Sequence, residues 1–317
     1  MVTKKISVIL PCYFASEFIG NVVERIKRTI NQNGKYDYEI ILVNDSPHDQ
    51  KTRIAIDKLC EQDNQIIGVH LAKNFGQDIA RVTGFHYATG DIVLNMDDDG
   101  QHPPEEMFKL IDKLEEGYDI VYANFIDNKH SFGRKATSYL NSKTMEFVGN
   151  KKEGVALSSY CAFSRLCADK IKEYKSPFPI ISSYLLQVTD NITDVLIYHN
   201  ERIFGKSGYS FFKRLKLELS VLTSFSVKPL RVSAILGFLF AAAGFILAIT
   251  TVVTRILNPA MNAGYASIFS AILVIGGIIL IILGLIGEYL GRMYMIINNC
   301  PQFVVRRVSC CDKKEKQ

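Results

Sequence analysis

Residues 91–105 read DIVLNMDDDGQHPPE. A short apolar run leads into three successive carboxylates, Asp97, Asp98 and Asp99, and two prolines then close a turn. Such a cluster repels itself unless a cation lies in it. Hard divalent ions such as Mg²⁺ take oxygen ligands and are commonly held by one or two carboxylates together with substrate phosphates. The stretch therefore predicts a strand that ends in a metal site for a nucleotide diphosphate, and a solvated acidic turn is the alternative.

Strand and helix signals alternate through the first 125 residues. A helix is predicted over 17–30, where apolar residues recur at helical spacing, and short buried strands are predicted at 6–12, 38–43, 66–71, 91–96 and 119–122. This alternation predicts an α/β fold with a mostly parallel, Rossmann-like sheet and right-handed crossovers.

Ligands of such sheets bind at the carboxyl ends of the strands. Turn-forming and polar residues follow each of the first four predicted strands: Pro11 and Tyr13, then Asp45, then Asn74 and Gly76, then the Asp triplet. Each could be ordinary turn chemistry. Together they outline one crevice.

Two segments predict membrane spans. The chain has 317 residues, and neither 232–254 nor 266–287 contains a charged side chain. About 20 helical residues cross a hydrocarbon core of roughly 30 Å. We therefore predict spans at 231–254 and 266–290 with an outward-facing loop at 255–265, and a buried soluble hairpin is the alternative.

Lysine and arginine flank the two spans on their outer sides, which by the positive-inside bias puts both large flanks in the cytoplasm. We expect a multi-pass protein of the cell inner (cytoplasmic) membrane, with a cytoplasmic catalytic domain at 1–210. Residues 211–230 predict an interfacial amphipathic helix on the lipid bilayer. Residues 291–317 are expected to form a basic cytoplasmic tail that ends as a frayed, surface-seeking segment. No nucleic-acid partner is expected.

A series of motifs follows in chain order: 7–13, 41–45, 74–76, 88–91, 96–105, 116–122, 202–210, 223–226, 229–231 and 287–292. The series resembles the polyisoprenyl-phosphate glycosyltransferases of glycosyltransferase family 2, which include the dolichyl-phosphate mannose synthases and bacterial two-span relatives acting on undecaprenyl phosphate. The resemblance covers nearly the whole chain.

This resemblance implies a GT-A fold and inverting transfer of a sugar from a nucleotide-diphospho-sugar to a polyisoprenyl phosphate, with Mg²⁺ or Mn²⁺ as cofactor. A UDP-sugar is favoured as donor. By position, Asp97 would contact the ribose or the metal, and Asp99 and Gln101 would hold the metal. The other residues implied in nucleotide-sugar binding are Pro11, Tyr13, Asp45, Asn74, Gly76 and Asp98.

The acceptor side departs from the family pattern. Ser159 stands where relatives have an acid and Cys161 where they have a base. A phosphate monoester has a second pKa near 6, so the lipid phosphate can attack without a protein base. It does need cationic positioning, for which Arg202 is the candidate, with Lys206, Ser207 and Arg134 as further lipid-phosphate ligands. The candidate catalytic residues are therefore Asp97, Asp99 and Arg202. In the loop after the first strand, Phe14 and Ala15 replace the Asn and Glu usual in the family.

Two other function classes stay open. A processive polysaccharide synthase would resemble its family in a Gln-x-x-Arg-Trp site, whereas this chain has no tryptophan. A non-catalytic, membrane-anchored nucleotide-sugar binder is conceivable because of Ser159 and Cys161. Small residues at Gly276, Gly277 and Gly284 also permit a homo-oligomer through the spans.

Overall fold

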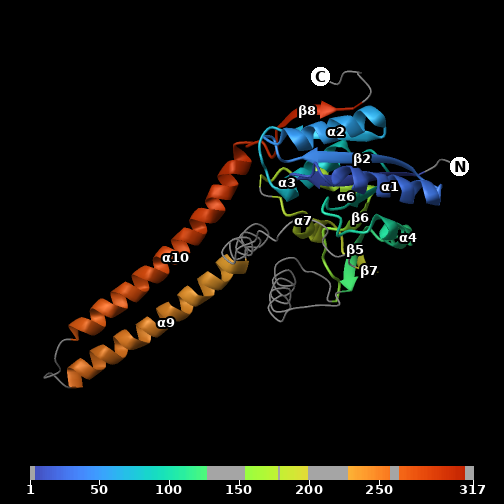
Figure 1. The fold of residues 1–317 in the computed structure, drawn as a ribbon. Helices are drawn as coiled ribbons and strands as arrows, with labels where there is room; N and C mark the ends of the chain where they lie inside the picture. Colours follow the sequence, from blue (N-terminus) through green and yellow to red (C-terminus); the bar gives the residue numbers. More distant parts are fainter. Residues whose placement is uncertain (1–3, 127–153, 178, 199–227, 258–263, 311–317) are drawn as a thin grey trace. The chain divides into compact units, whose positions relative to one another are not determined.

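A computed structural model describes residues 4–126, 154–177, 179–198, 228–257 and 264–310. The chain divides into two compact units, one of residues 1–214 with 300–317 and one of residues 215–299. The first unit is an α/β domain and the second is a helical hairpin (Figure 1).

In the α/β domain, the described residues form an eight-stranded sheet in the order β7-β5-β6-β4-β1-β2-β3-β8. The four central strands β4, β1, β2 and β3 are parallel, whereas β6 runs antiparallel to β4 and β5, and β8 runs antiparallel to β3. The strands are β1 Lys5–Cys12, β2 Asp37–Asn44, β3 Ile66–Leu71, β4 Ile92–Asn95, β5 Ile120–Ile126, β6 Cys161–Ser164, β7 Ile192–Tyr198 and β8 Val305–Ser309. The predicted mostly parallel α/β fold is confirmed, and the five predicted strands lie within a few residues of the observed ones.

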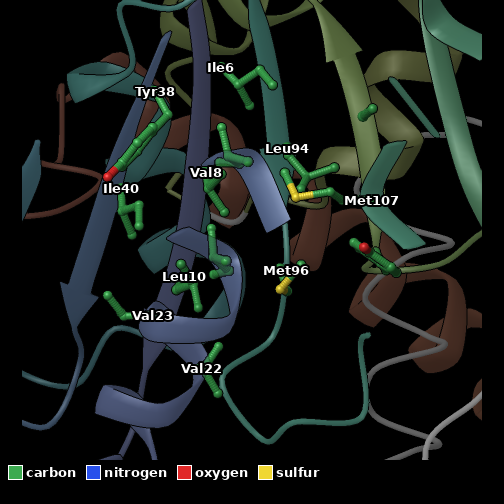
Figure 2. Packing of buried hydrophobic residues seen from close by; sticks show 14 of the residues in the cluster. Ile6, Val8, Leu10, Val22, Val23, Tyr38, Ile40, Leu94, Met96 and Met107 are labelled. Atoms are coloured by element: carbon green, nitrogen blue, oxygen red, sulfur yellow. The ribbon is translucent and has the colours of Figure 1, made fainter. Parts of the chain in front are cut away.

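Helices cover both faces of the sheet. One apolar layer contains side chains of α1, α2 and α4, and the other contains side chains of α3, α6 and α7. Successive residues of β1 alternate between the layers, as a strand requires: Val8 and Leu10 belong to the first and Ile9 to the second. Figure 2 shows part of the first layer, where Ile6, Val8 and Leu10 of β1 lie between the side chains of β2 and Leu94 of β4. The helices are α1 Ile19–Asn33, α2 Gln50–Gln62, α3 Gln77–Tyr87, the short 3-10 helix η1 Pro104–Glu106, α4 Met107–Glu115, α6 Arg165–Glu173 and α7 Ile181–Val188.

Helix α3 lies unusually close to β1. A Cβ atom placed on Gly84 would come within 2.3 Å of Ile9 Cγ2, so only glycine permits this approach. The close packing fixes α3 against the strand, and the first two turns of α3 then face the carboxyl end of the sheet.

A buried polar network at the amino ends of the parallel strands accounts for the motif at 88–91. Glu39 accepts hydrogen bonds from the Ser7 hydroxyl (2.5 Å) and the Thr89 amide (2.6 Å), and Lys5 Nζ lies 2.7 Å from its carboxylate. The Gly90 amide donates to Ser7 Oγ (2.8 Å), and a Cβ on Gly90 would meet Lys5 O at 2.7 Å. This motif therefore holds the α3–β4 connection in place, at the end of the strands opposite to Asp97, Asp98 and Asp99.

The C-terminal segment corrects one prediction. Residues 305–309 form β8, which pairs with β3 in the register Gly68↔Ser309 and His70↔Arg307. The expectation of a frayed tail at this point is therefore wrong. Without β8, strand β3 would expose its backbone groups along the sheet edge, and β8 satisfies them while its arginines face solvent.

The helical unit contains α9, Lys228–Leu257, and α10, Tyr265–Ile297, which contact each other. Each contains a candidate membrane span, Leu230–Leu247 and Val274–Ile297, with none of either span buried. At about 1.5 Å per residue, helices of 30 and 33 residues exceed the roughly 30 Å of a hydrocarbon core. Exposed apolar side chains on all sides suit lipid and not water. The predicted spans 231–254 and 266–290 fall inside these helices, while 211–227 and the loop at 258–263 lie outside the described residues.

Candidate active site

The loops after β1, β2, β3 and β4 meet at the carboxyl edge of the sheet, where the sequence predicts a crevice. Asp45, buried after β2, accepts hydrogen bonds from the amides of Phe75 (2.7 Å) and Gly76 (2.8 Å) in the loop after β3. The Tyr13 amide, after β1, donates to Asp98 Oδ2 after β4 (3.1 Å). The strand-end residues predicted to act together are therefore tied to one another in two pairs.

Asp97 is held by three protein donors. Its Oδ1 accepts hydrogen bonds from Gln77 Nε2 (2.8 Å) and Arg81 Nη2 (2.9 Å), and its Oδ2 accepts one from the Ser159 hydroxyl (2.8 Å). Burial by itself would raise the pKa of Asp97, but His102 and Arg81 beside it outweigh burial and hold that pKa below its usual range. Asp97 is therefore an ionised anchor inside the site.

Sequence reasoning missed Gln77 and Arg81. Both come from the first two turns of α3, and Arg81 also pairs with Asp78 (3.1 Å). The spacing Asp78-x-x-Arg81 is a local ion-pair signal that could have drawn attention to this helix face. Arg81 Nε is buried and has no hydrogen-bond partner within the described part of the chain.

Ser159 and Cys161 have different roles from the acid and base they replace. The Ser159 hydroxyl donates to Asp97, so it supports the negative charge that a second acid would oppose. Cys161 is buried in β6, and burial raises the pKa of its thiol. Cys161 is therefore a core residue and cannot act as a base.

Asp98 and Asp99 are the other two carboxylates of the triplet. Burial, augmented by the neighbouring charges of Asp97 and Asp99, raises the pKa of Asp98 to about 7, although the Tyr13 amide opposes the rise. Asp99 accepts a hydrogen bond from the Gln101 amide (3.1 Å) across Gly100, whose φ of 75° makes the turn possible. A cation beside these two carboxylates would relieve their mutual repulsion.

The donor set fits a hard divalent ion. Asp99 and Gln101, two of the predicted ligands, offer oxygen atoms, the ligand type that Mg²⁺ and Mn²⁺ prefer, and so does the adjacent Asp98. Asp97 is also a predicted metal ligand, but both of its carboxylate oxygens accept hydrogen bonds from Gln77, Arg81 and Ser159. Among the residues that the structure describes, no three His, Cys, Asp or Glu side chains form a complete cage. Such an ion would complete its coordination with phosphate oxygens and water, as Mg²⁺ commonly does.

The rest of the motif is a rigid frame. The His102 ring stacks against both Phe125 (ring centroids 5.5 Å apart) and Tyr160 (4.9 Å), and its Nδ1 accepts a hydrogen bond from the Asp97 amide (2.9 Å). The Tyr160 hydroxyl donates to the Pro103 carbonyl (2.8 Å). These contacts fix the backbone on both sides of Asp98 and Asp99.

A bidentate ion pair completes the frame. Arg25 of α1 donates to both carboxylate oxygens of Glu105, at 2.8 and 2.7 Å. Two parallel hydrogen bonds give this pair a defined geometry. The Glu at the end of the motif is thus structural.

The predicted acceptor residues cannot be compared with this geometry. Arg134, Arg202, Lys206 and Ser207 all lie outside the described residues. Their roles stay predictions from the sequence.

A mostly parallel sheet with an acidic cluster at its carboxyl edge, in a chain that also carries two long apolar helices, is typical of nucleotide-using enzymes attached to membranes. Residues 7–173 match glycosyl transferase family 2, and residues 228–293 match the GtrB C-terminal hairpin. The chain belongs to glycosyl transferase family 2, and it is a membrane-associated glycosyltransferase.

Two relatives are similar over almost their whole length. Both are undecaprenyl-phosphate 4-deoxy-4-formamido-L-arabinose transferases. The Proteus mirabilis protein is 32% identical over 98% of this chain and 96% of its own. The Photorhabdus laumondii protein is 32% identical over 96% of this chain and 94% of its own.

One solved structure supports the fold. Glucosyl-3-phosphoglycerate synthase from Mycobacterium tuberculosis, in complex with phosphoglyceric acid, has a TM-score of 0.50 and 18% identity, covering 70% of this chain and 79% of that one. At this identity the likeness concerns the fold alone.

Proposed function

We propose that this protein transfers a sugar, with inversion at the anomeric carbon, from a nucleotide-diphospho-sugar to a polyisoprenyl phosphate. A UDP-sugar is the preferred donor and undecaprenyl phosphate the preferred acceptor. The reaction takes place at the cytoplasmic face of the inner membrane and yields a lipid-phosphate-linked monosaccharide. The observation that carries the proposal is the acidic cluster at the carboxyl edge, in a chain whose full-length relatives are named as undecaprenyl-phosphate transferases.

The donor half of the site has groups for the diphosphate and for the nucleoside. Asp99, Asp98 and Gln101 would hold a divalent ion, which when bound offsets the charge that develops on the leaving nucleotide diphosphate. Tyr13 and Pro11 flank the nucleoside, and Asp45 keeps the loop of Asn74 and Gly76 closed beside it. Asp97 accepts a hydrogen bond from Arg81 and so holds the turn of Asp98 and Asp99 in place.

The acceptor supplies its own nucleophile. A phosphate oxygen forms a bond to the anomeric carbon while the bond from that carbon to the diphosphate oxygen breaks, and the electron pair leaves with the nucleotide. No protein base is required, because the lipid phosphate is largely dianionic at neutral pH. Arg202, Lys206, Ser207 and Arg134 remain the proposed contacts for that phosphate. Since Ser159 supports Asp97 and Cys161 is a core residue, neither substitution argues for a non-catalytic binder.

The test is incubation of the purified full-length protein, in detergent, with undecaprenyl phosphate, Mn²⁺ and a panel of nucleotide sugars. The panel includes the UDP-linked form of 4-deoxy-4-formamido-L-arabinose, the sugar named for the relatives. We expect one UDP-sugar to give a charged glycolipid carrying a single sugar. A polymer of several sugars, or free sugar with no lipid product, would reject the proposal.

A further inference from the structure

A buried chain of hydrogen bonds begins at the C-terminal strand. The Ser309 hydroxyl of β8 donates to Asp57 Oδ1 of α2 (2.6 Å), and His70 Nε2 of β3 lies 3.1 Å from the same oxygen. The other ring nitrogen, His70 Nδ1, lies 3.1 Å from Asn44 Nδ2 at the carboxyl end of β2. Ser309, His70 and Asn44 are all buried.

The contacts of Asn44 decide which atom donates and which accepts in each hydrogen bond of this chain. Asn44 Oδ1 already accepts the amide (2.9 Å) and the hydroxyl (2.8 Å) of Ser46. The Asn44 amide nitrogen must therefore face His70 and donate to Nδ1, which puts the ring proton on Nε2, where it is donated to Asp57. Burial lowers the pKa of His70, against the opposing effect of Asp57, and this keeps the ring neutral as the arrangement requires.

The chain ends at two exposed aromatic rings beside the acidic triplet. The Ser46 hydroxyl oxygen accepts the Phe14 amide (3.3 Å), and the adjacent Tyr13 amide is held by Asp98 (3.1 Å). Phe14 has a φ of 51°, which is rare for a bulky residue and persists only where the surroundings impose it. The two rings meet edge to face at 4.7 Å, and each is more than half exposed.

We propose that His70 is a positioning residue for donor binding. It links strand β8, through hydrogen bonds of Asn44 and Ser46, to the Tyr13–Phe14 pair, and so holds in position the two rings that receive the nucleobase. A flat base stacks on an exposed aromatic ring, and the pair lies next to the carboxylates proposed to hold the diphosphate through a metal ion. The residues that follow the membrane hairpin thus help to set nucleotide affinity. This inference rests on the donor half of the proposed function.

Two substitutions of His70 separate its two contacts. Asn can place an acceptor near the position of Nδ1 and keep the Asn44 bond, whereas Gln can place a donor near the position of Nε2 and keep the Asp57 bond. In the full-length protein with Mn²⁺, we expect His70→Gln to weaken UDP binding about five- to tenfold, the effect of one lost hydrogen bond. His70→Asn should bind UDP within about twofold of wild type. At saturating donor, kcat should change little in either variant.

Three further variants, at two positions, serve as controls. Ser309→Ala loses a contact on the Asp57 side of His70, as His70→Asn does, so it should weaken UDP binding by no more than about twofold. Ser309→Thr should restore the wild-type affinity, because threonine keeps the hydroxyl that donates to Asp57. Ser7→Ala removes a hydroxyl from the other buried network, at the amino edge, and should lower the free energy of unfolding without changing UDP affinity.

Hydrogen exchange of the ligand-free protein tests the positioning directly. We expect faster exchange at the amides of Phe14 and Ser46 in His70→Gln than in His70→Asn. Equal exchange in the two variants, or equal UDP affinity, overturns the inference. A wild type that binds UDP with this pattern of variants but transfers nothing to undecaprenyl phosphate would uphold the inference and reject the acceptor half of the proposed function.

Discussion

Arg81 and Asp97 form the ion pair on which the acidic turn depends. Their side chains are only 13% and 19% exposed, and Asp97 accepts its other hydrogen bonds from neutral groups. Removing one partner of such a pair leaves the other charge poorly solvated, which costs more than the pair itself contributes.

We therefore expect Arg81→Met to lower the free energy of unfolding by about 2 kcal/mol, since Asp97 would lose the guanidinium that pairs with its carboxylate. The double variant Arg81→Met with Asp97→Asn should be less destabilised than the sum of the two single variants. Urea unfolding of the four proteins measures this coupling. Additive losses would mean that the two side chains do not depend on each other.

At the scale of elements, the sequence located strands that lie between turn residues and are buried on both faces. Strands β6, β7 and β8 were not predicted, and β6 and β8 were missed for different reasons. β6 has only four residues, and β8 carries Arg306 and Arg307, which look like a solvated tail until an edge strand is available to pair with them. Charged residues are common on edge strands because one side of them faces water.

The residues of the candidate site likewise divide into those that the sequence predicts and those that it does not. Asp45 and the Asp triplet could be predicted, because the carboxyl ends of parallel strands meet at one edge. The contacts of Arg81, Ser159 and His70 could not. Their partners lie 16 to 62 positions away, and neither the spacing of Arg81 from Asp78 nor the place of Ser159 in the family pattern reveals those contacts.

The contact of β3 with α2 and β8 predicts that the stability of the folded protein depends on pH. Burial lowers the pKa of His70 from its usual 6.5, with Arg307 and Arg53 adding to the fall and Asp57 opposing it. The unfolded chain then binds the proton more readily than the folded one, so stability is lost as the pH falls below about 6.5. We expect His70→Asn to lose less stability than wild type between pH 7 and pH 5, as measured by thermal unfolding. Parallel pH profiles would exclude this contribution.

At the scale of the whole molecule, the two units follow different physical rules. The α/β domain buries its apolar residues in two layers, whereas α9 and α10 expose theirs. Composition alone predicted the second unit, because long uncharged segments have few alternatives to a membrane.

The orientation of the hairpin is testable in cells. If the flanking cations set the topology, the loop that contains Asn262 faces outward. Asn262→Cys should then react with an impermeant thiol reagent in intact cells, and the wild type gives the background from its own cysteines. Reaction only after the cells are opened would reverse the assignment.

The central claim is that Asp99 serves a bound divalent ion in sugar transfer to a lipid phosphate. The most direct measurement is the rate of glycolipid formation by Asp99→Asn and by wild type, each with Mn²⁺ and with a chelator. Asparagine keeps the oxygen that accepts the Gln101 amide, so the fold should survive, as unfolding curves can verify. We predict a loss of about a thousandfold or more in rate for Asp99→Asn, and a comparable loss for chelated wild type. A variant that works at the wild-type rate, or a wild type equally active with chelator, would contradict the account.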